Sequence, residues 1–155
     1  MEITIENLDT KSKDYKEFLE RQRTKTNEFN KENIFFIFAS SEREFKEKLD
    51  KLGYDKTDIA SIGAGAYCQA KNYAKVNMFL DDIADEKKKY VTSDCDNFYG
   101  ALYYELWNNE YYFNADNQAI ARALGVDEEN ILSEFPKANE VVYIYLDEFE
   151  KLNLW

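Results

Sequence analysis

FYGALYYELWNNEYYF runs from Phe98 to Phe113, and half of its sixteen residues are aromatic. On a helix with about 100° per residue, its apolar side chains fall on two opposite sides. A helix that is apolar all round is either buried on both sides or presents a binding surface. One side carries Phe98, Ala101, Leu102, Leu106 and Phe113, and we expect it to be core. The other carries Tyr103, Tyr104, Trp107 and Tyr111, and we expect it either to be a partly exposed, protein-binding stripe or to be buried under the N- or C-terminal helix.

The chain is acidic, with 31 Asp and Glu residues against 20 Lys and Arg residues and a net charge of −11. This balance argues against nucleic-acid binding, which needs Lys and Arg at the phosphates. It suits either solubility or a partner protein with a basic surface. Asp81, Asp82, Asp85 and Glu86 are expected on the exposed side of a helix over 70–89 and could bind such a partner. The inward side of that helix is expected to hold Tyr73, Val76, Leu80 and Ile83.

A length of 155 residues predicts a single domain over 1–155. No run of about 18 apolar residues is present, so we expect no membrane contact. The first residues, MEITIENLDTK, lack the pattern of a signal peptide. Two cysteines, Cys68 and Cys95, are too few for a disulfide framework and are expected as small core residues. Together these features favour a cytoplasmic location.

The hydrophobic pattern predicts an α+β, mostly helical fold, with about six helices around a small two- or three-stranded sheet. Capping signals support several helix ends, including Ser41-x-x-Glu44, Gly53, Asp94 or Asp96, and the pair Asp116 and Gly125. Helices are expected over residues 11–31, 41–52, 70–89, 98–113, 116–125, 128–135 and 138–155, and strands over 34–39, 59–62 and near 66–68. The last segment also has strand propensity at 141–145, but its spacing fits a helix better.

Gly63-x-Gly65-x-x-Cys68 is similar to a dinucleotide-binding fingerprint, although cysteine stands at the third position. The simpler interpretation is a turn of small residues where two backbones approach closely. A small-ligand or nucleotide site at Gly63, Gly65 and Tyr67 is therefore an alternative hypothesis.

The sequence has no histidine, so neither cysteine has the usual base of a catalytic thiol. The acidic residues Asp94 and Asp96 are explained by helix capping rather than by metal binding. Glu105 and Asn109 lie one helical turn apart and indicate either a polar network that fixes helix register or a proton-transfer group. We therefore expect a protein that is not an enzyme, with no metal and no cofactor.

Four motifs in this order resemble a group of small uncharacterised proteins encoded by phages and mobile elements. They are FFIFAS at residues 35–40, SIGAGAY at 61–67, YELWNNEY at 104–111 and AIARALGV at 119–126. The resemblance implies a phage or mobile-element setting and no established activity, and Asn109 stands where those proteins carry histidine. Small acidic proteins from such settings often block host defence nucleases, including CRISPR effectors. By that analogy we expect an inhibitor of a host protein in the bacterial cytoplasm, or otherwise a structural or regulatory phage protein.

Overall fold

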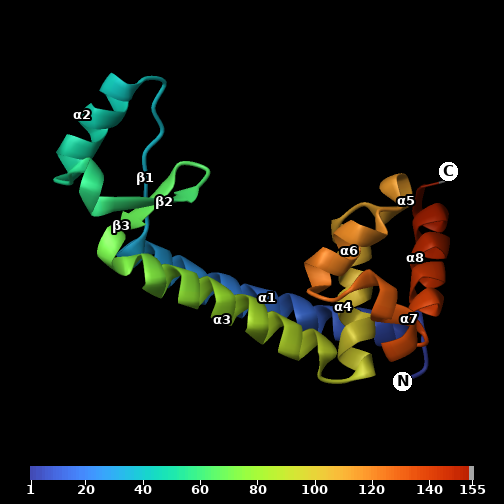
Figure 1. Cartoon of the computed structure of the whole chain (residues 1–155). Coiled ribbons are helices and arrows are strands. Elements are labelled where there is room, and N and C mark those ends of the chain that lie inside the picture. Colours follow the sequence, from blue (N-terminus) through green and yellow to red (C-terminus); the bar gives the residue numbers. More distant parts are fainter. Residues whose placement is uncertain (154–155) are drawn as a thin grey trace. The chain divides into compact units, whose positions relative to one another are not determined.

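The computed structural model describes residues 1–153 and confirms an α+β, mostly helical fold with a small three-stranded antiparallel sheet (Figure 1). Among these residues there are eight α-helices: α1 (Ile5–Asn33), α2 (Glu42–Leu52), α3 (Tyr73–Thr92), α4 (Cys95–Asn108), α5 (Tyr111–Asn114), α6 (Asn117–Leu124), α7 (Ile131–Glu134) and α8 (Ala138–Asn153). The strands are β1 (Phe35–Phe36), β2 (Ile59–Gly63) and β3 (Ala66–Gln69). Short 3₁₀ turns are η1 (Lys56–Asp58), η2 (Ala70–Asn72) and η3 (Glu128–Asn130).

The chain divides into two compact units, and α1 and α3 each contribute residues to both. The helical unit comprises residues 1–20 and 84 onward, and the sheet unit comprises residues 21–83. Within the helical unit, Phe18 of α1 stacks on Tyr90 of α3 with ring centroids 4.3 Å apart. The single domain expected over residues 1–155 stays a prediction.

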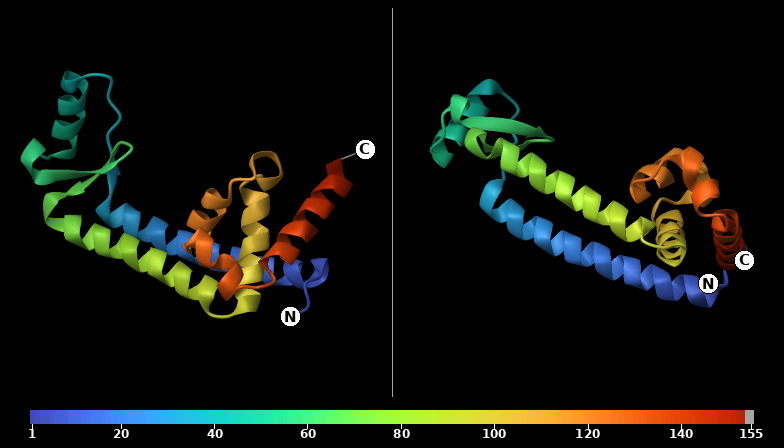
Figure 2. Two further views of the ribbon diagram at one scale, coloured as in Figure 1. Left: turned by 45° about the vertical axis from the view of Figure 1, so that its right-hand side comes forward. Right: turned by 60° about the horizontal axis from the view of Figure 1, so that its bottom comes forward.

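In the helical unit, α4 lies between α6 and α8 and supplies six of the fifteen buried core residues, more than any other helix (Figure 2). Phe98 stacks face to face on Phe135 with ring centroids 3.7 Å apart, as expected for the core side of the aromatic helix. Gly100 lies against the backbone of Lys11 in α1, where a Cβ atom would be 2.6 Å from the Lys11 carbonyl carbon. The absence of a side chain at Gly100 therefore allows α1 and α4 to approach closely.

The predicted caps begin and end several of these helices. Asp94 accepts a hydrogen bond from the Asn97 amide at 2.7 Å at the start of α4, and Asp116 accepts one from the Ala119 amide at 3.0 Å at the start of α6. Gly125 ends α6 in the left-handed conformation. The predicted helix at the end of the chain is confirmed as α8 over Ala138–Asn153, and its last two predicted residues lie outside the described range.

The start of α2 differs in one detail from the predicted capping box. Ser41 caps the helix as expected, because its hydroxyl accepts from the Glu44 amide at 3.1 Å. Glu44, however, reaches back to Ser40, from whose amide and hydroxyl it accepts hydrogen bonds. These bonds, helped by Lys48, lower the pKa of the Glu44 carboxyl to about 2.

The sheet unit places β3 between β1 and β2. Its buried side chains, from the strand segments, α2 and α3, are Ile37, Leu49, Ala66, Cys68 and Val76. Phe29 of α1 stacks on Phe79 of α3 with ring centroids 3.9 Å apart. This stack turns Phe79 inward, so Tyr73 and Leu80, both predicted to face inward, are exposed.

Two other expectations were wrong. The buried strand predicted over 34–39 is paired only at Phe35 and Phe36, because Phe36 lies opposite Ala66, where the partner strand begins. Phe36 and Phe38 are exposed, since the antiparallel sheet leaves one face open there. Cys95 is also exposed rather than core, because it is the first residue of α4, directly after the Asp94 cap.

Candidate functional site

The aromatic segment is not one helix, because α4 ends at Asn108 and the chain turns. Glu110 adopts a left-handed conformation (φ 52°, ψ 44°), and the short helix α5 follows before Ala115 takes the same conformation (φ 46°, ψ 35°). Neither residue is glycine, so both positions carry backbone strain. The turn moves Phe113 away from the core side on which it was expected and leaves it 73% exposed.

The stripe expected on the other side of α4 is mostly covered. Tyr103 is 5% exposed, so the expectation that it is partly exposed was wrong. Tyr104 is half-buried against Tyr15 of α1, with ring centroids 5.3 Å apart. Trp107 is half-buried against Tyr145 of α8, with centroids 4.9 Å apart. The residues of α1 and α8 in this unit thus cover the side that a single-helix analysis left open.

Tyr111 is also half-buried, in the first turn of α5. Its hydroxyl donates a hydrogen bond to Asn117 Oδ1 at 2.6 Å, and its ring lies 6.3 Å from that of Tyr145. Whether any of the four stripe residues contacts a partner stays a prediction.

An exposed aromatic surface exists nearby, where α5 meets the last turns of α8. Tyr112 stacks on Phe149 with centroids 4.2 Å apart, and Phe113 meets the same ring edge-on at 5.4 Å. We use the name aromatic patch for these three rings together with the half-buried Trp107 and the fully buried Tyr145 that Phe149 contacts, so that it comprises Trp107, Tyr112, Phe113, Tyr145 and Phe149. Phe113 and Tyr112 are its exposed members.

Sequence reasoning missed Tyr112 and Phe149, and it placed Phe113 in the core. The usable signal was the pair Asn108-Asn109, since asparagine is a poor residue for the interior of a helix and favours its ends. Reading a helix end there would have placed Tyr112 and Phe113 after the turn.

Glu105 is the one buried carboxylate among residues 1–153. The hydroxyl of Tyr15 donates to its Oε1 at 3.0 Å, and Asn109 Nδ2 donates to its Oε2 at 2.9 Å. Burial, together with Glu105, raises the pKa of Tyr15 above its usual value. Glu105 therefore has both the Asn109 amide and a tyrosine hydroxyl as partners, as the polar-network interpretation expects. This arrangement joins α1 to α4 inside the core and fits a structural role.

Charge is divided unevenly between the units. The helical unit carries 21 acidic and 9 basic side chains, a net charge of −12, whereas the sheet unit carries 10 acidic and 11 basic, a net charge of +1. The aromatic patch therefore belongs to the unit that holds all of the excess negative charge.

The predicted acidic group on α3 is divided between the units. Asp81 and Asp82 are exposed in the sheet unit. Asp85 is exposed in the helical unit, and Glu86 beside it is half-buried rather than fully exposed. The exposed side of α3 is also not purely acidic, because Met78 and Leu80 are exposed on the same helix.

Gly63 and Gly65 form the turn of the β2–β3 hairpin. Gly63, Ala64 and Gly65 all have positive φ, and strand β3 follows the turn. A dinucleotide fingerprint needs a helix at that place, so the context for phosphate binding is missing here. Tyr67 does line a cavity of about 730 Å³, together with Ile37, Phe45, Leu49 and Tyr54. Gly63 and Gly65 do not line it.

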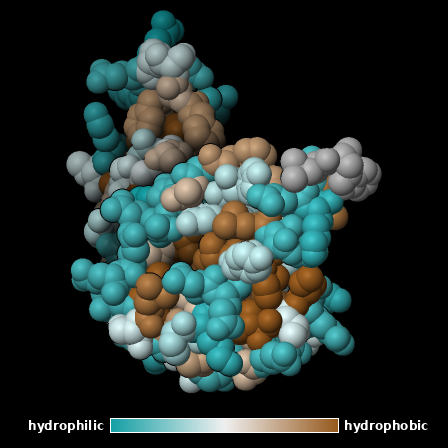
Figure 3. Space-filling view, turned by 90° about the vertical axis from the view of Figure 1, so that its right-hand side faces the viewer, coloured by the Kyte–Doolittle hydropathy of each residue, from teal (hydrophilic) through white to brown (hydrophobic). Residues whose placement is uncertain are grey.

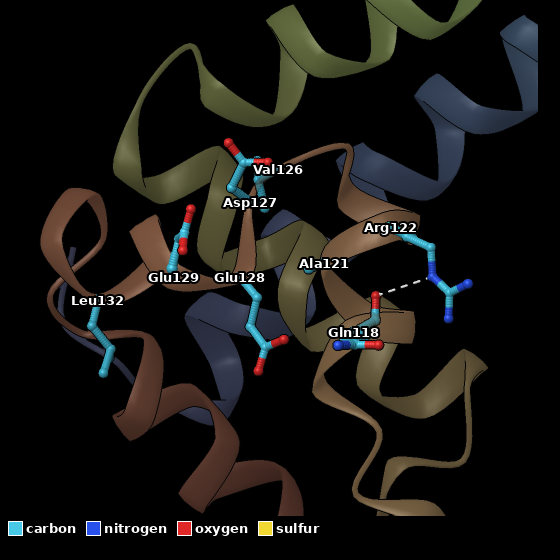
Figure 4. A pocket seen from close by; sticks show the side chains of 8 residues that line it. All are labelled: Gln118, Ala121, Arg122, Val126, Asp127, Glu128, Glu129 and Leu132. Atoms are coloured by element: carbon cyan, nitrogen blue, oxygen red, sulfur yellow. Dashed lines mark hydrogen bonds between the residues drawn. The ribbon is translucent and has the colours of Figure 1, made fainter.

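Two further cavities lie in the helical unit. One, of about 640 Å³, is bordered by α6 and η3, and Figure 4 shows its lining side chains. It is lined by Gln118, Ala121, Arg122, Val126, Asp127, Glu128, Glu129 and Leu132. The other, of about 180 Å³, is mainly apolar and lies among α4, α6, α7 and α8.

Within residues 1–153, no group of three or more His, Cys, Asp or Glu side chains could hold a metal ion. No described helix is long and apolar enough to cross a membrane.

The fold and the site together define a small α+β protein with a strongly acidic helical unit and an exposed aromatic patch. Residues 15–141 match DUF7659, a family of unknown function, and the chain belongs to that family. Comparison with curated proteins and with solved structures finds no match.

Proposed function

We propose that this protein acts by binding another protein with a basic surface, and that it carries out no catalysis. The observation that carries the proposal is the exposure of Phe113 and Tyr112 in a unit of net charge −12. Aromatic side chains supply much of the energy of protein interfaces, and unlike charges speed the encounter. Phe149 holds both rings in place, so little conformational freedom is lost on binding.

The setting we propose is the bacterial cytoplasm, with a phage or mobile element as the source and a host protein as the partner. Binding would then inhibit the host protein, and a nuclease of host defence or a CRISPR effector fits, because such proteins have basic nucleic-acid channels. The acidic unit would compete for that channel. Support comes from the charge and from the motifs at residues 35–40, 61–67, 104–111 and 119–126.

Affinity capture from bacterial lysate, compared between variants, tests the proposal. We expect the wild-type chain to retain a basic protein that Phe113→Ala loses and that added salt releases. Leu152→Ala is the matched control, because Leu152 is 59% exposed in the same unit but lies outside the aromatic patch. The proposal is contradicted if the Phe113→Ala variant captures the same protein equally well, or if the captured protein is acidic. If the captured partner is a nuclease, its activity is then measured with and without this protein. Full activity in the presence of this protein contradicts inhibition.

A second candidate function is the binding of a small polar ligand or nucleotide in the sheet unit. It is favoured by the cavity of about 730 Å³ that Tyr67 lines, a size typical of ligand sites. Thermal melting with a panel of nucleotides tests it, with Tyr67→Ala as the variant that should abolish any stabilisation.

A further inference from the structure

The apolar cavity in the helical unit has the size of a pocket for one bulky side chain. Its volume is about 180 Å³, and a cavity of roughly 150 Å³ is enough to hold a benzene molecule. Its apolar lining comes mainly from Leu102, Leu106, Ile120, Ile131, Leu132 and Val142. Leu132 is 52% exposed and lies at the mouth of the cavity, where solvent or a partner reaches it.

The acidic cavity of Figure 4 adjoins the apolar one, because Glu128 and Leu132 line both. Its rim carries three consecutive carboxylates, Asp127, Glu128 and Glu129, and none of them forms an ion pair within residues 1–153. Arg122 is the one cationic side chain that lines it, and its Nε donates to the Gln118 carbonyl oxygen at 3.4 Å. An apolar pocket and an acidic rim thus share one border.

The space-filling view toward the side of α5 to α8 shows hydrophobic side chains gathered near the middle of the surface, with hydrophilic side chains around them (Figure 3). An apolar centre with a polar rim is the usual anatomy of a protein interface.

We propose that the two adjoining cavities form one groove, lined by α6, η3, α7 and α8, that binds a basic amphipathic helix of a partner protein. This rests on the proposed function and names the part of the partner that is recognised. An apolar side chain of the partner helix enters the cavity beside Leu132. Lys or Arg side chains one turn away pair with Asp127, Glu128 and Glu129, because residues three or four apart share one helix face.

Charge selects this occupant over others. A nucleic acid or an anionic membrane surface is repelled by a unit of net charge −12. A second copy of this chain is unsuited for the same reason, since its helical unit has the same charge and its sheet unit carries only +1. A basic helix with one apolar face fits both halves of the groove.

Fluorescence anisotropy with labelled synthetic helices tests the inference on the full chain. The probe is an amphipathic helix of leucine and lysine, and a second peptide has every leucine replaced by glutamine at the same charge. We expect the first peptide to bind at least roughly tenfold more tightly than the second. Leu132→Ala and Glu128→Lys should each weaken binding of the first peptide roughly tenfold.

Leu152→Ala and Glu17→Lys are the matched controls, because they make the same kinds of change at exposed positions of the same unit outside the groove. Both should bind the leucine–lysine peptide as the wild type does. Circular dichroism should show unchanged helix content for all four variants, since each of these side chains is wholly or largely exposed.

Equal binding of the two peptides would show that charge alone acts, and would overturn the inference. So would the absence of binding, or binding that Leu132→Ala leaves unchanged. If a captured host partner is lost with Phe113→Ala but kept with Leu132→Ala and Glu128→Lys, the proposed function stands and the groove fails. If the leucine–lysine peptide binds in the groove but no basic partner is captured, the groove stands and the proposed function fails.

Discussion

Tyr15 in α1 donates a hydrogen bond from its hydroxyl to Oε1 of Glu105 in α4, at 3.0 Å, and both side chains are buried. The two residues are 90 positions apart in sequence. Asn109 Nδ2 donates to the second carboxylate oxygen. In the part of the chain that the structure describes, no buried side-chain N or O atom lacks a hydrogen-bond partner. The bond ties the start of the chain to the central helix of the helical unit.

Removing this hydrogen bond should destabilise the protein. We expect Tyr15→Phe to lower the free energy of unfolding by about 2 kcal/mol, because a buried hydrogen bond to a carboxylate is lost. Urea denaturation measures the change, with Tyr143→Phe as control, since Tyr143 is exposed and should move stability by less than about 0.5 kcal/mol. A double-mutant cycle with Glu105→Ala, which removes the acceptor, should give a coupling between the two residues of about 1 kcal/mol or more. Additive effects of the two substitutions would contradict a direct interaction.

Stability should fall at alkaline pH. Burial raises the pKa of Tyr15 and also of Tyr99, Tyr103, Tyr111 and Tyr145. An unfolded tyrosine titrates near pH 10, so above about that pH the unfolded chain has lost protons that the folded chain still holds. The stabilisation is therefore complete below about pH 10 and is lost as the pH rises further. Thermal melting across this range measures it, and Tyr15→Phe should flatten the dependence. An unchanged slope in that variant would assign the effect to other groups.

Gly100→Ala should destabilise the protein although alanine favours helices. Alanine gains about 1 kcal/mol of helix propensity, but its Cβ would lie 2.6 Å from the Lys11 carbonyl carbon, which belongs to the backbone and cannot rotate away. We expect a net loss of about 2 kcal/mol in the free energy of unfolding. Gly53→Ala is the control, because a Cβ atom at this position would have no neighbouring atom within 4 Å. Its only cost is the left-handed φ of 80°, which is unfavourable for alanine by about 1 kcal/mol. A stabilised Gly100→Ala variant would mean that α1 and α4 are not in close contact.

The two cysteines should react at different rates with a thiol reagent. Cys95 is exposed and should be labelled at once under native conditions. Cys68 is fully buried in the sheet unit, and burial raises its pKa, so it should react only when that unit opens. Mass spectrometry after timed labelling measures both rates. Fast native labelling of Cys68 would contradict its burial.

Binding of the proposed basic partner should depend steeply on salt. The Debye length falls from ~10 Å at 0.1 M to ~3 Å at 1 M salt, so attraction between the surfaces is screened. Charge reversal at Asp81, Asp82, Asp85 or Glu86 should slow association more than it speeds dissociation. Trp107→Ala should instead speed dissociation, because it removes part of the aromatic patch. Surface plasmon resonance across a salt series separates these effects. An affinity that does not change with salt would exclude charge-driven binding and would indicate docking through apolar contacts alone.

Local signals in the sequence predicted helix ends well because a cap depends on a few neighbouring residues. Ser41 caps the start of α2 and Gly53 its end, and Asp116 and Gly125 do the same for α6, as their residue types indicate. The hairpin turn at Gly63 and Gly65 was also visible, since two glycines allow the positive φ that it needs. These features require no knowledge of the rest of the chain.

The exposed surface could not be predicted in the same way, because exposure depends on distant segments. Tyr103 and Tyr104 fall on a side of α4 that periodicity leaves open, but other helices of the unit, including the first residues of α1, cover it. Phe113 was assigned to the core on the assumption that the helix continued past Asn108. The length of β1 likewise depends on where its partner strand begins, and its own apolar run carries no such information.

The division of the chain has a consequence for its synthesis. The sheet unit is one continuous segment, residues 21–83, while the helical unit joins residues 1–20 to the segment that starts at residue 84. During synthesis the sheet unit is therefore complete before the helical unit is. Leu8 and Tyr15, which are made early, lack their core neighbours until Val141 and Tyr145 have been synthesised. During that interval Leu8 and Tyr15 stay exposed on an otherwise charged segment, and the acidic unit is the last to be completed.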